Sequence, residues 1–141
     1  MRHEDILAEF YRTVWSEGDV ASLGRYFSPD ALTAGISPEF AFRIEDFQAL
    51  VQAVLRLVDN VDVKLVRLVS EGEWLSALTE VSCTSRRTGA PVRLRGQSIM
   101  RFVDGKIVEA HNNFDTLDFF VQLGMLRPDF TVRLLVESDA A

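Results

Sequence analysis

The spacing of apolar residues in the first part of the chain predicts helices. From Glu4 to Ser16, apolar side chains recur at steps of three and four residues, the spacing of a helix that buries one face. Asp19 is placed to cap a short second helix that stops at Ser28–Asp30, because an Asp side chain accepts hydrogen bonds from the free backbone N–H groups at the start of a helix. After an irregular stretch around residues 35–38, a third apolar stripe runs from Ile44 to Val58.

After residue 60 the pattern changes to alternation, which predicts strands. Apolar and polar residues alternate from Val61 to Leu65, and a two-residue period is typical of a strand with one buried face. Asp104-Gly105 favours a two-residue hairpin turn of type I′. Asp115 or Thr116 can then cap a short final helix that ends at Gly124. Turn-forming residues bound the three remaining strands: Leu75–Arg87, Val92–Val103 and Lys106 to about Phe114.

Helices followed by a meander of antiparallel strands predict a segregated α+β fold. A curved, mainly antiparallel sheet would wrap the three N-terminal helices and bury their apolar faces. The outer face of the sheet keeps apolar residues, so we expect a homodimer through the sheet to cover them. Because no linker or repeat interrupts the pattern, residues 1–141 are expected to form a single domain.

Charge and hydropathy narrow the range of partners. Fifteen Lys and Arg residues against 21 Asp and Glu residues give a net charge of -6. Nucleic acid and anionic membranes are therefore not expected as partners, because both bind basic surfaces. No stretch approaches the roughly 20 apolar residues that cross a bilayer, and Met1–Asp5 lacks the basic start of a signal peptide. We therefore expect a cytoplasmic protein.

Motifs for cofactors and metals are missing from the sequence. Cys83 is the single cysteine, and His3 and His111 lie far apart, which excludes an internal disulfide and a Cys/His metal cluster. No glycine-rich nucleotide-binding motif, zinc-peptidase motif or hydrolase nucleophile motif occurs. No metal or other cofactor is therefore expected, and any chemistry must use side chains alone.

Several segments, taken in their order and spacing, are similar to one known family. They are Phe10–Tyr11, Trp15–Asp19, Tyr26–Ala31, Arg101–Glu109, Asp115 and Gln122–Gly124. Together they resemble the SnoaL-like polyketide cyclases of the nuclear transport factor 2-like superfamily, from about residue 4 to residue 126. The resemblance implies a cone-like fold with a deep apolar pocket, usually dimeric. Such families include cofactor-free cyclases, isomerases, epoxide hydrolases and dehydratases beside non-catalytic members, so the fold does not decide the function.

Asp115 is the first candidate for a catalytic group. The resemblance implies that an Asp at this position, after the strand that contains Lys106–Glu109, is the general acid/base of ring closure. At the mouth of an apolar cavity a carboxylate loses hydration, which raises its pKa and suits it to proton transfer near neutral pH. The alternative is an ordinary N-cap of the helix at residues 116–123.

Further candidates come from the sheet and the first helix. His111, where many relatives have Trp, could orient or protonate a carbonyl; alternatively it hydrogen bonds in a polar patch with Asn113. Tyr11 and Trp15 share a helix face and are candidates for the pocket wall, although aromatic residues at this spacing are usually core. Gln97 is a candidate substrate contact, or else part of a polar row that faces a dimer partner.

Strand register decides which of these residues face the pocket. With a tight turn at Asp104-Gly105, residues at equal distances from the turn lie opposite each other, which pairs Ser98 with His111. His111, Asn113 and Asp115 would then share a face with Ser98. A single β-bulge would move them to the other face.

The leading hypothesis is a small cofactor-independent enzyme in which Asp115 moves a proton on a hydrophobic carbonyl compound. His111, Asn113 or Gln97 would stabilise the oxyanion. The alternative is a non-catalytic module that binds a small hydrophobic molecule or dimerises, and epoxide hydrolysis, which needs a second acid, is a third hypothesis. Phe residues from both halves of the chain could meet across a cone and line its cavity: Phe10, Phe27, Phe40, Phe42 and Phe47 with Phe102, Phe114, Phe119, Phe120 and Phe130.

Overall fold

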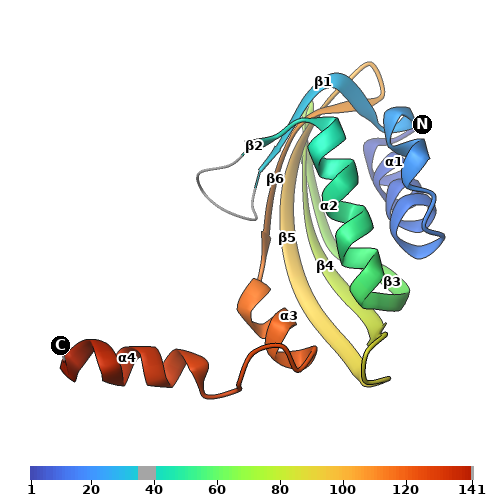
Figure 1. The fold of residues 1–141 in the computed structure, drawn as a ribbon. Helices are drawn as coiled ribbons and strands as arrows, with labels where there is room; N and C mark the ends of the chain where they lie inside the picture. Colours follow the sequence, from blue (N-terminus) through green and yellow to red (C-terminus); the bar gives the residue numbers. More distant parts are fainter. Residues whose placement is uncertain (35–40, 141) are drawn as a thin grey trace.

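The computed structural model describes residues 1–34 and 41–140. The predicted irregular stretch around residues 35–38 lies outside them. The elements, in chain order (Figure 1), are α1 (His3–Phe10), the π-helix η1 (Tyr11–Ser16), the 3₁₀ helix η2 (Val20–Arg25), β1 (Phe27–Ala34), β2 (Ala41–Phe42), α2 (Ile44–Leu57), β3 (Val58–Glu71), β4 (Trp74–Ser85), β5 (Pro91–Val103), β6 (Lys106–Phe114), α3 (Thr116–Gln122) and α4 (Phe130–Ala140).

A sheet of six strands, counted over the described residues, curves around the helices. Its order is β2-β1-β6-β5-β4-β3. Strands β1 and β6 run parallel, and every other neighbouring pair is antiparallel. Figure 1 shows α2 and the N-terminal helical segment together on one side of the curved strands. The predicted α+β fold, with helices wrapped by a mainly antiparallel sheet, is confirmed.

The core lies between these helices and the sheet. Leu7 and Val14 from the helical segment and Leu75, Phe102 and Ile107 from the strands are almost fully buried. Helix α4 lies apart from this core, since its described side chains after Phe130 are all exposed, and Figure 1 shows the helix projecting away from the rest. Among the described residues, no helix is long and apolar enough to cross a membrane.

The first helix differs from its prediction in its second half. It is an α-helix only as far as Phe10, and from Tyr11 its turns widen to the π form. A π-turn is a local insertion in the helical ladder that the spacing of apolar residues does not show. The predicted side-chain cap by Asp19 is also wrong: Ser22 Oγ instead donates to the Asp19 carbonyl oxygen at 2.7 Å.

Strand β1 was not predicted. Ser28–Asp30 follow the end of the short helix, as predicted, but they lie within this strand. The strand is held by parallel pairing with β6, where Ala34 lies beside His111. Its register is irregular in the part that contains Pro29, a residue without a backbone N–H to give. Because the partner strand is far away in sequence, local pattern alone could not show this pairing.

The register of the hairpin between β5 and β6 determines which residues of β6 face the helices. Asp104 and Gly105 have φ values of 51° and 76°, as the predicted type I′ turn requires. The strands are paired regularly for two residue pairs after the turn, as far as Phe102 and Ile107. The register then shifts, and Val108 is left without a partner opposite it. Ser98 therefore lies opposite Asn112, and the predicted pairing of Ser98 with His111 is wrong.

Candidate functional site

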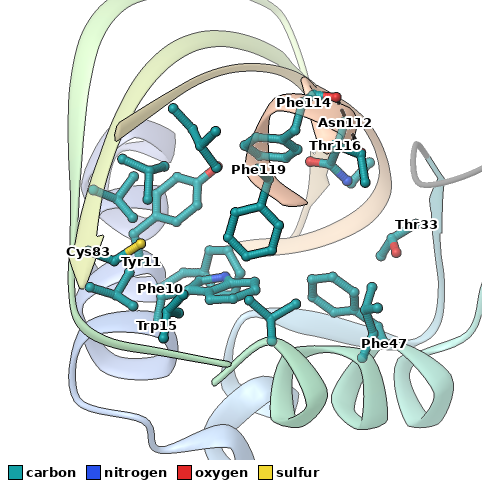
Figure 2. A pocket seen from close by; sticks show the side chains of 18 of the residues that line it. Phe10, Tyr11, Trp15, Thr33, Phe47, Cys83, Asn112, Phe114, Thr116 and Phe119 are labelled. Atoms are coloured by element: carbon teal, nitrogen blue, oxygen red, sulfur yellow. Dashed lines mark hydrogen bonds between the residues drawn. The ribbon is translucent and has the colours of Figure 1, made fainter. Parts of the chain in front are cut away.

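A cavity of about 260 Å³ lies between the concave face of the sheet and the helices. Figure 2 shows aromatic side chains from several elements around it, with Phe119 of α3 reaching toward its middle. The wall consists of Phe10, Tyr11, Trp15, Phe27, Thr33, Ala34, Phe47, Leu50, Val54, Val58, Val61, Val63, Val81, Cys83, Leu94, Met100, Ala110, Asn112, Phe114, Thr116, Phe119 and Phe120.

Phenylalanine rings join the helical side of the wall. The ring of Phe27 lies with its centroid 5.3 Å from that of Phe10 and 5.6 Å from that of Phe47. Phe102 belongs to the core rather than the wall, where it stacks on His3 with a centroid separation of 4.4 Å. The predicted contributions of Phe40 and of the Phe42 side chain lie outside the described residues, and Phe130 is not part of the wall.

Polar side chains at the cavity form a hydrogen-bonded chain. Ser98 Oγ donates to Asn112 Oδ1 at 2.7 Å, and Asn112 Nδ2 donates to the carbonyl oxygen of Ala34 at 3.1 Å. The hydroxyl of Tyr11 also hydrogen bonds with Ser98. This chain ties η1, β5, β6 and β1 together at one part of the wall.

Two titratable side chains line the cavity, and both stay neutral more readily than in water. Burial raises the pKa of Tyr11 above its ordinary value of 10.0, although the hydrogen bond with Ser98 lowers it in part. Burial also raises the pKa of the Cys83 thiol, which disfavours the nucleophilic thiolate. Among the described residues, no Asp or Glu side chain lines the cavity.

Asp115 lies at the start of α3 and outside the wall. Its Oδ1 accepts a hydrogen bond from the backbone N–H of Asp118 at 2.9 Å, so it is the N-cap of α3, as one of the two alternatives predicted. The residue is exposed, while the next residue, Thr116, lines the cavity. The carboxylate therefore sits beside the cavity, in contact with water rather than in apolar surroundings.

His111 lies on the outer face of the sheet, with more than half of its side chain exposed. Its Nε2 is 3.6 Å from Glu109 Oε2, and its partner across the ladder is Ile99. The expectation that His111 and Asn113 share a face with Ser98 is wrong. The unpaired Val108 turns each following residue of β6 to the opposite face, because side chains alternate along a strand.

The other predicted contacts divide in the same way. Tyr11 and Trp15 line the cavity, at the place where the helix widens to the π form. Gln97 and Asn113 are ladder partners, and both are exposed on the outer face. Arg95 lies on this face too, and its Nη2 is 2.9 Å from Glu80 Oε1, as expected for a polar row.

The sequence interpretation missed Asn112, Thr33 and Thr116, which line the cavity. Asn112 was assigned to the wrong face by the regular register, and Thr33 lies on a strand that was not predicted. The only available signal was the alternation of β6 itself, where Ala110, Asn112 and Phe114 are as plausible an inner face as their neighbours. No group of three or more His, Cys, Asp or Glu side chains that could hold a metal occurs among the described residues.

The fold and the cavity define a cone-shaped α+β domain. Comparison with known families shows to which family this domain belongs. The model of the SnoaL-like domain matches residues 7–110, which is most of the chain. The protein belongs to the SnoaL-like domain family. The matched range ends just before His111, so Asn112, Asp115 and α3 lie beyond it.

Solved structures with the same fold come from several bacteria. IdmH of Streptomyces antibioticus, a proposed polyketide cyclase, has a TM-score of 0.76 at 20% identity, covering 88% of this chain and 99% of its own. AclR of Streptomyces galilaeus, a proposed hydroxylase, has a TM-score of 0.75 at 20% identity, covering 88% of this chain and 96% of its own. A proposed polyketide cyclase of Acidithiobacillus ferrooxidans has a TM-score of 0.72 at 18% identity, covering 86% of this chain and 94% of its own. Identities this low establish the fold alone. No curated protein matches the sequence.

Proposed function

We propose that this domain binds a small hydrophobic carbonyl compound in its cone cavity. The composition of the wall is the observation that supports the proposal most directly: it is aliphatic and aromatic except for a few side chains, chiefly Tyr11, Thr33, Asn112 and Thr116. Small-molecule sites have this make-up, with a few polar groups that orient the ligand. Each Å² of apolar ligand surface removed from water would contribute about 25 cal/mol.

The similarity to proposed polyketide cyclases supports the ligand class. Their names imply oxygenated ring compounds, which combine apolar surface with carbonyl groups. Such a compound fits this cavity, since its rings would contact the Phe residues while one oxygen reached Asn112, a polar residue of the wall that Ser98 holds by a hydrogen bond.

Calorimetric titration of 2-acetylnaphthalene and of 1-anilinonaphthalene-8-sulfonate tests the binding proposal. Leu94→Trp would fill the cavity from β5, and Arg95→Trp adds the same side chain at the next position on the exposed face. We expect the wild type and Arg95→Trp to bind alike, and Leu94→Trp to bind at least about tenfold more weakly, because a filled cavity cannot bury the ligand. Failure of the wild type to bind either probe, or equal binding by Leu94→Trp, would contradict the proposal.

Proton transfer by Asp115 is the second candidate function. Its support is the position of Asp115 directly before Thr116, a residue of the wall. The reacting carbon of the ligand would then lie at the mouth, beside the carboxylate, with the apolar part inside. The carboxylate would take a proton from the carbon next to the carbonyl and later return one, leaving the enolate as the intermediate. His111 and Gln97, on the outer face, take no part in this scheme.

Hydrogen exchange distinguishes this candidate from binding alone. In D₂O, a base acting on 2-acetylnaphthalene replaces the methyl hydrogens by deuterium, which proton NMR follows directly. If Asp115 is the base, the wild type accelerates the exchange and Asp115→Asn does not, although both bind the ketone equally. If the wild type binds the ketone without accelerating exchange, proton transfer is excluded for this compound and the binding proposal stands.

A further inference from the structure

We propose that Asn112 holds the carbonyl oxygen of the ligand through the amide hydrogen that its protein partners leave free. The inference rests on the proposed function, because it requires a ligand in the cavity. It assigns a specific role to a residue on the inner face of β6 that only the bulge at Val108 brings to the wall.

The hydrogen bonds around Asn112 fix which way its amide points. The carbonyl oxygen of Ala34 can only accept, so the atom 3.1 Å from it must be the amide nitrogen. Asn112 Oδ1 then faces Ser98, whose hydroxyl donates to it at 2.7 Å. An amide nitrogen has two hydrogens, and the bond to Ala34 uses one of them. Among the described residues, no hydrogen bond uses the second.

The remaining hydrogen is a donor in apolar surroundings. Asn112 is half-buried and lines the cavity, and Figure 2 places its side chain beside Thr116 and close to the ring of Phe114. A donor in a poorly solvated site forms a stronger hydrogen bond than it would in water. The group to which it best donates is an acceptor that carries no hydrogen of its own: the oxygen of a ketone, an aldehyde or an ester.

Other polar side chains of the wall are less available as donors. The Tyr11 hydroxyl already hydrogen bonds with Ser98, and Thr116 Oγ1 donates to the Phe114 carbonyl oxygen at 3.4 Å. The competing donors are the hydroxyl of Thr33, whose side chain is buried at the wall, and the indole N–H of Trp15, which also lines the cavity. Asn112 has the advantage of being fixed at two atoms by different strands, so that a ligand need not immobilise it on binding.

A pair of matched probes tests the assignment. 2-Acetylnaphthalene and 2-isopropenylnaphthalene have nearly the same shape, but only the ketone has an oxygen to accept the hydrogen bond. Titration calorimetry gives the ratio of their dissociation constants for the wild type, for Asn112→Leu and for Thr33→Val. We expect Asn112→Leu to shift this ratio about tenfold toward the alkene, the effect of losing one buried hydrogen bond, and Thr33→Val to leave it unchanged.

Infrared spectroscopy of the bound ketone provides a second measurement, which does not depend on comparing two ligands. With the carbonyl carbon labelled by ¹³C, the C=O band of the ketone bound to the wild type should lie below its position in hexane, and should return toward that position in Asn112→Leu. A ratio that Asn112→Leu leaves unchanged, a ratio that Thr33→Val shifts instead, or a band at the hexane position would each overturn the role of Asn112 while leaving binding intact. Failure of the wild type to bind either probe would instead contradict the proposed function.

Discussion

Phe114 and Gly96 face each other across the ladder between β5 and β6, and the ring of Phe114 lies over the glycine. A Cβ atom added at Gly96 would stand 2.1 Å from Cε1 and 2.5 Å from Cδ1 of that ring. Phe114 is part of the cavity wall. The missing side chain of Gly96 therefore sets where one side of the cavity lies.

Gly96→Ala should destabilise the fold for this reason. In a strand with free space, Ala in place of Gly stabilises by roughly 0.5–1 kcal/mol. Here the new methyl group would displace the Phe114 ring, and overpacking of this kind costs about 1–3 kcal/mol. Urea unfolding monitored by circular dichroism measures the difference.

The double variant separates the contact from a general effect at Gly96. In a Phe114→Ala background the obstructing ring is absent, so Gly96→Ala should cost much less or become stabilising. The interaction energy from the four-protein cycle is expected to exceed about 1 kcal/mol. Equal costs in the two backgrounds would show that the ring is not the cause.

Much of the fold follows from local pattern. The apolar stripe from Ile44 to Val58 marks α2 to within one residue, and Asp104-Gly105 marks its turn because both positions need positive φ. The missed strand β1 depends on pairing with β6, a contact between segments distant in sequence. Propensity near Pro29 opposes a strand, and only the tertiary pairing overrides it.

The site was predictable to the level of its wall but not of its polar groups. Tyr11 and Trp15 were correctly placed at the wall from the helical spacing, which the π-turn does not change enough to turn them away. On β6, the unpaired Val108 places Asn112 at the cavity wall, where the regular register predicted Asn113. The position of a bulge depends on how the curved sheet closes around the helices, and the residue types in Ile107–Glu109 do not indicate one.

Asp115 has a structural role that can be measured apart from any chemistry. Replacing an Asp N-cap by Ala typically costs about 1 kcal/mol, whereas Asn caps almost as well. Asp115→Ala should therefore lower the free energy of unfolding by about that amount, and Asp115→Asn should leave it nearly unchanged. Chemical denaturation checks both values. If Asp115→Ala is as stable as the wild type, the hydrogen bond to the Asp118 N–H contributes nothing measurable.

Tyr11 should make stability depend on pH in the alkaline range. Its pKa is raised in the folded protein above the ordinary 10.0, so the folded state binds the phenolic proton more tightly than the unfolded state. The stabilisation is fully present below pH 10 and is lost as the pH rises through the folded-state pKa, by up to about 1.4 kcal/mol per pH unit.

Urea unfolding between pH 8 and pH 11 tests this dependence, with Tyr11→Phe as the comparison. Phe keeps the ring and lacks the ionising group, so the wild type should lose stability relative to Tyr11→Phe above about pH 10. Parallel pH profiles for the two proteins would show that Tyr11 ionises equally easily in both states.

We propose that the outer face of the sheet is covered in a homodimer, and sedimentation velocity tests it. Ile99 on β5 is 42% exposed on that face, opposite His111 and on the same face of the strand as Arg95, which forms an ion pair with Glu80. Ile99→Lys would place a charge against its own copy, so the wild type should sediment as a dimer and this variant as a monomer at micromolar concentration. Val132→Lys is the matched control on α4, where Val132 is 62% exposed, and it should remain dimeric. A monomeric wild type would contradict the proposal, and dissociation by Val132→Lys alone would move the interface from the sheet to α4.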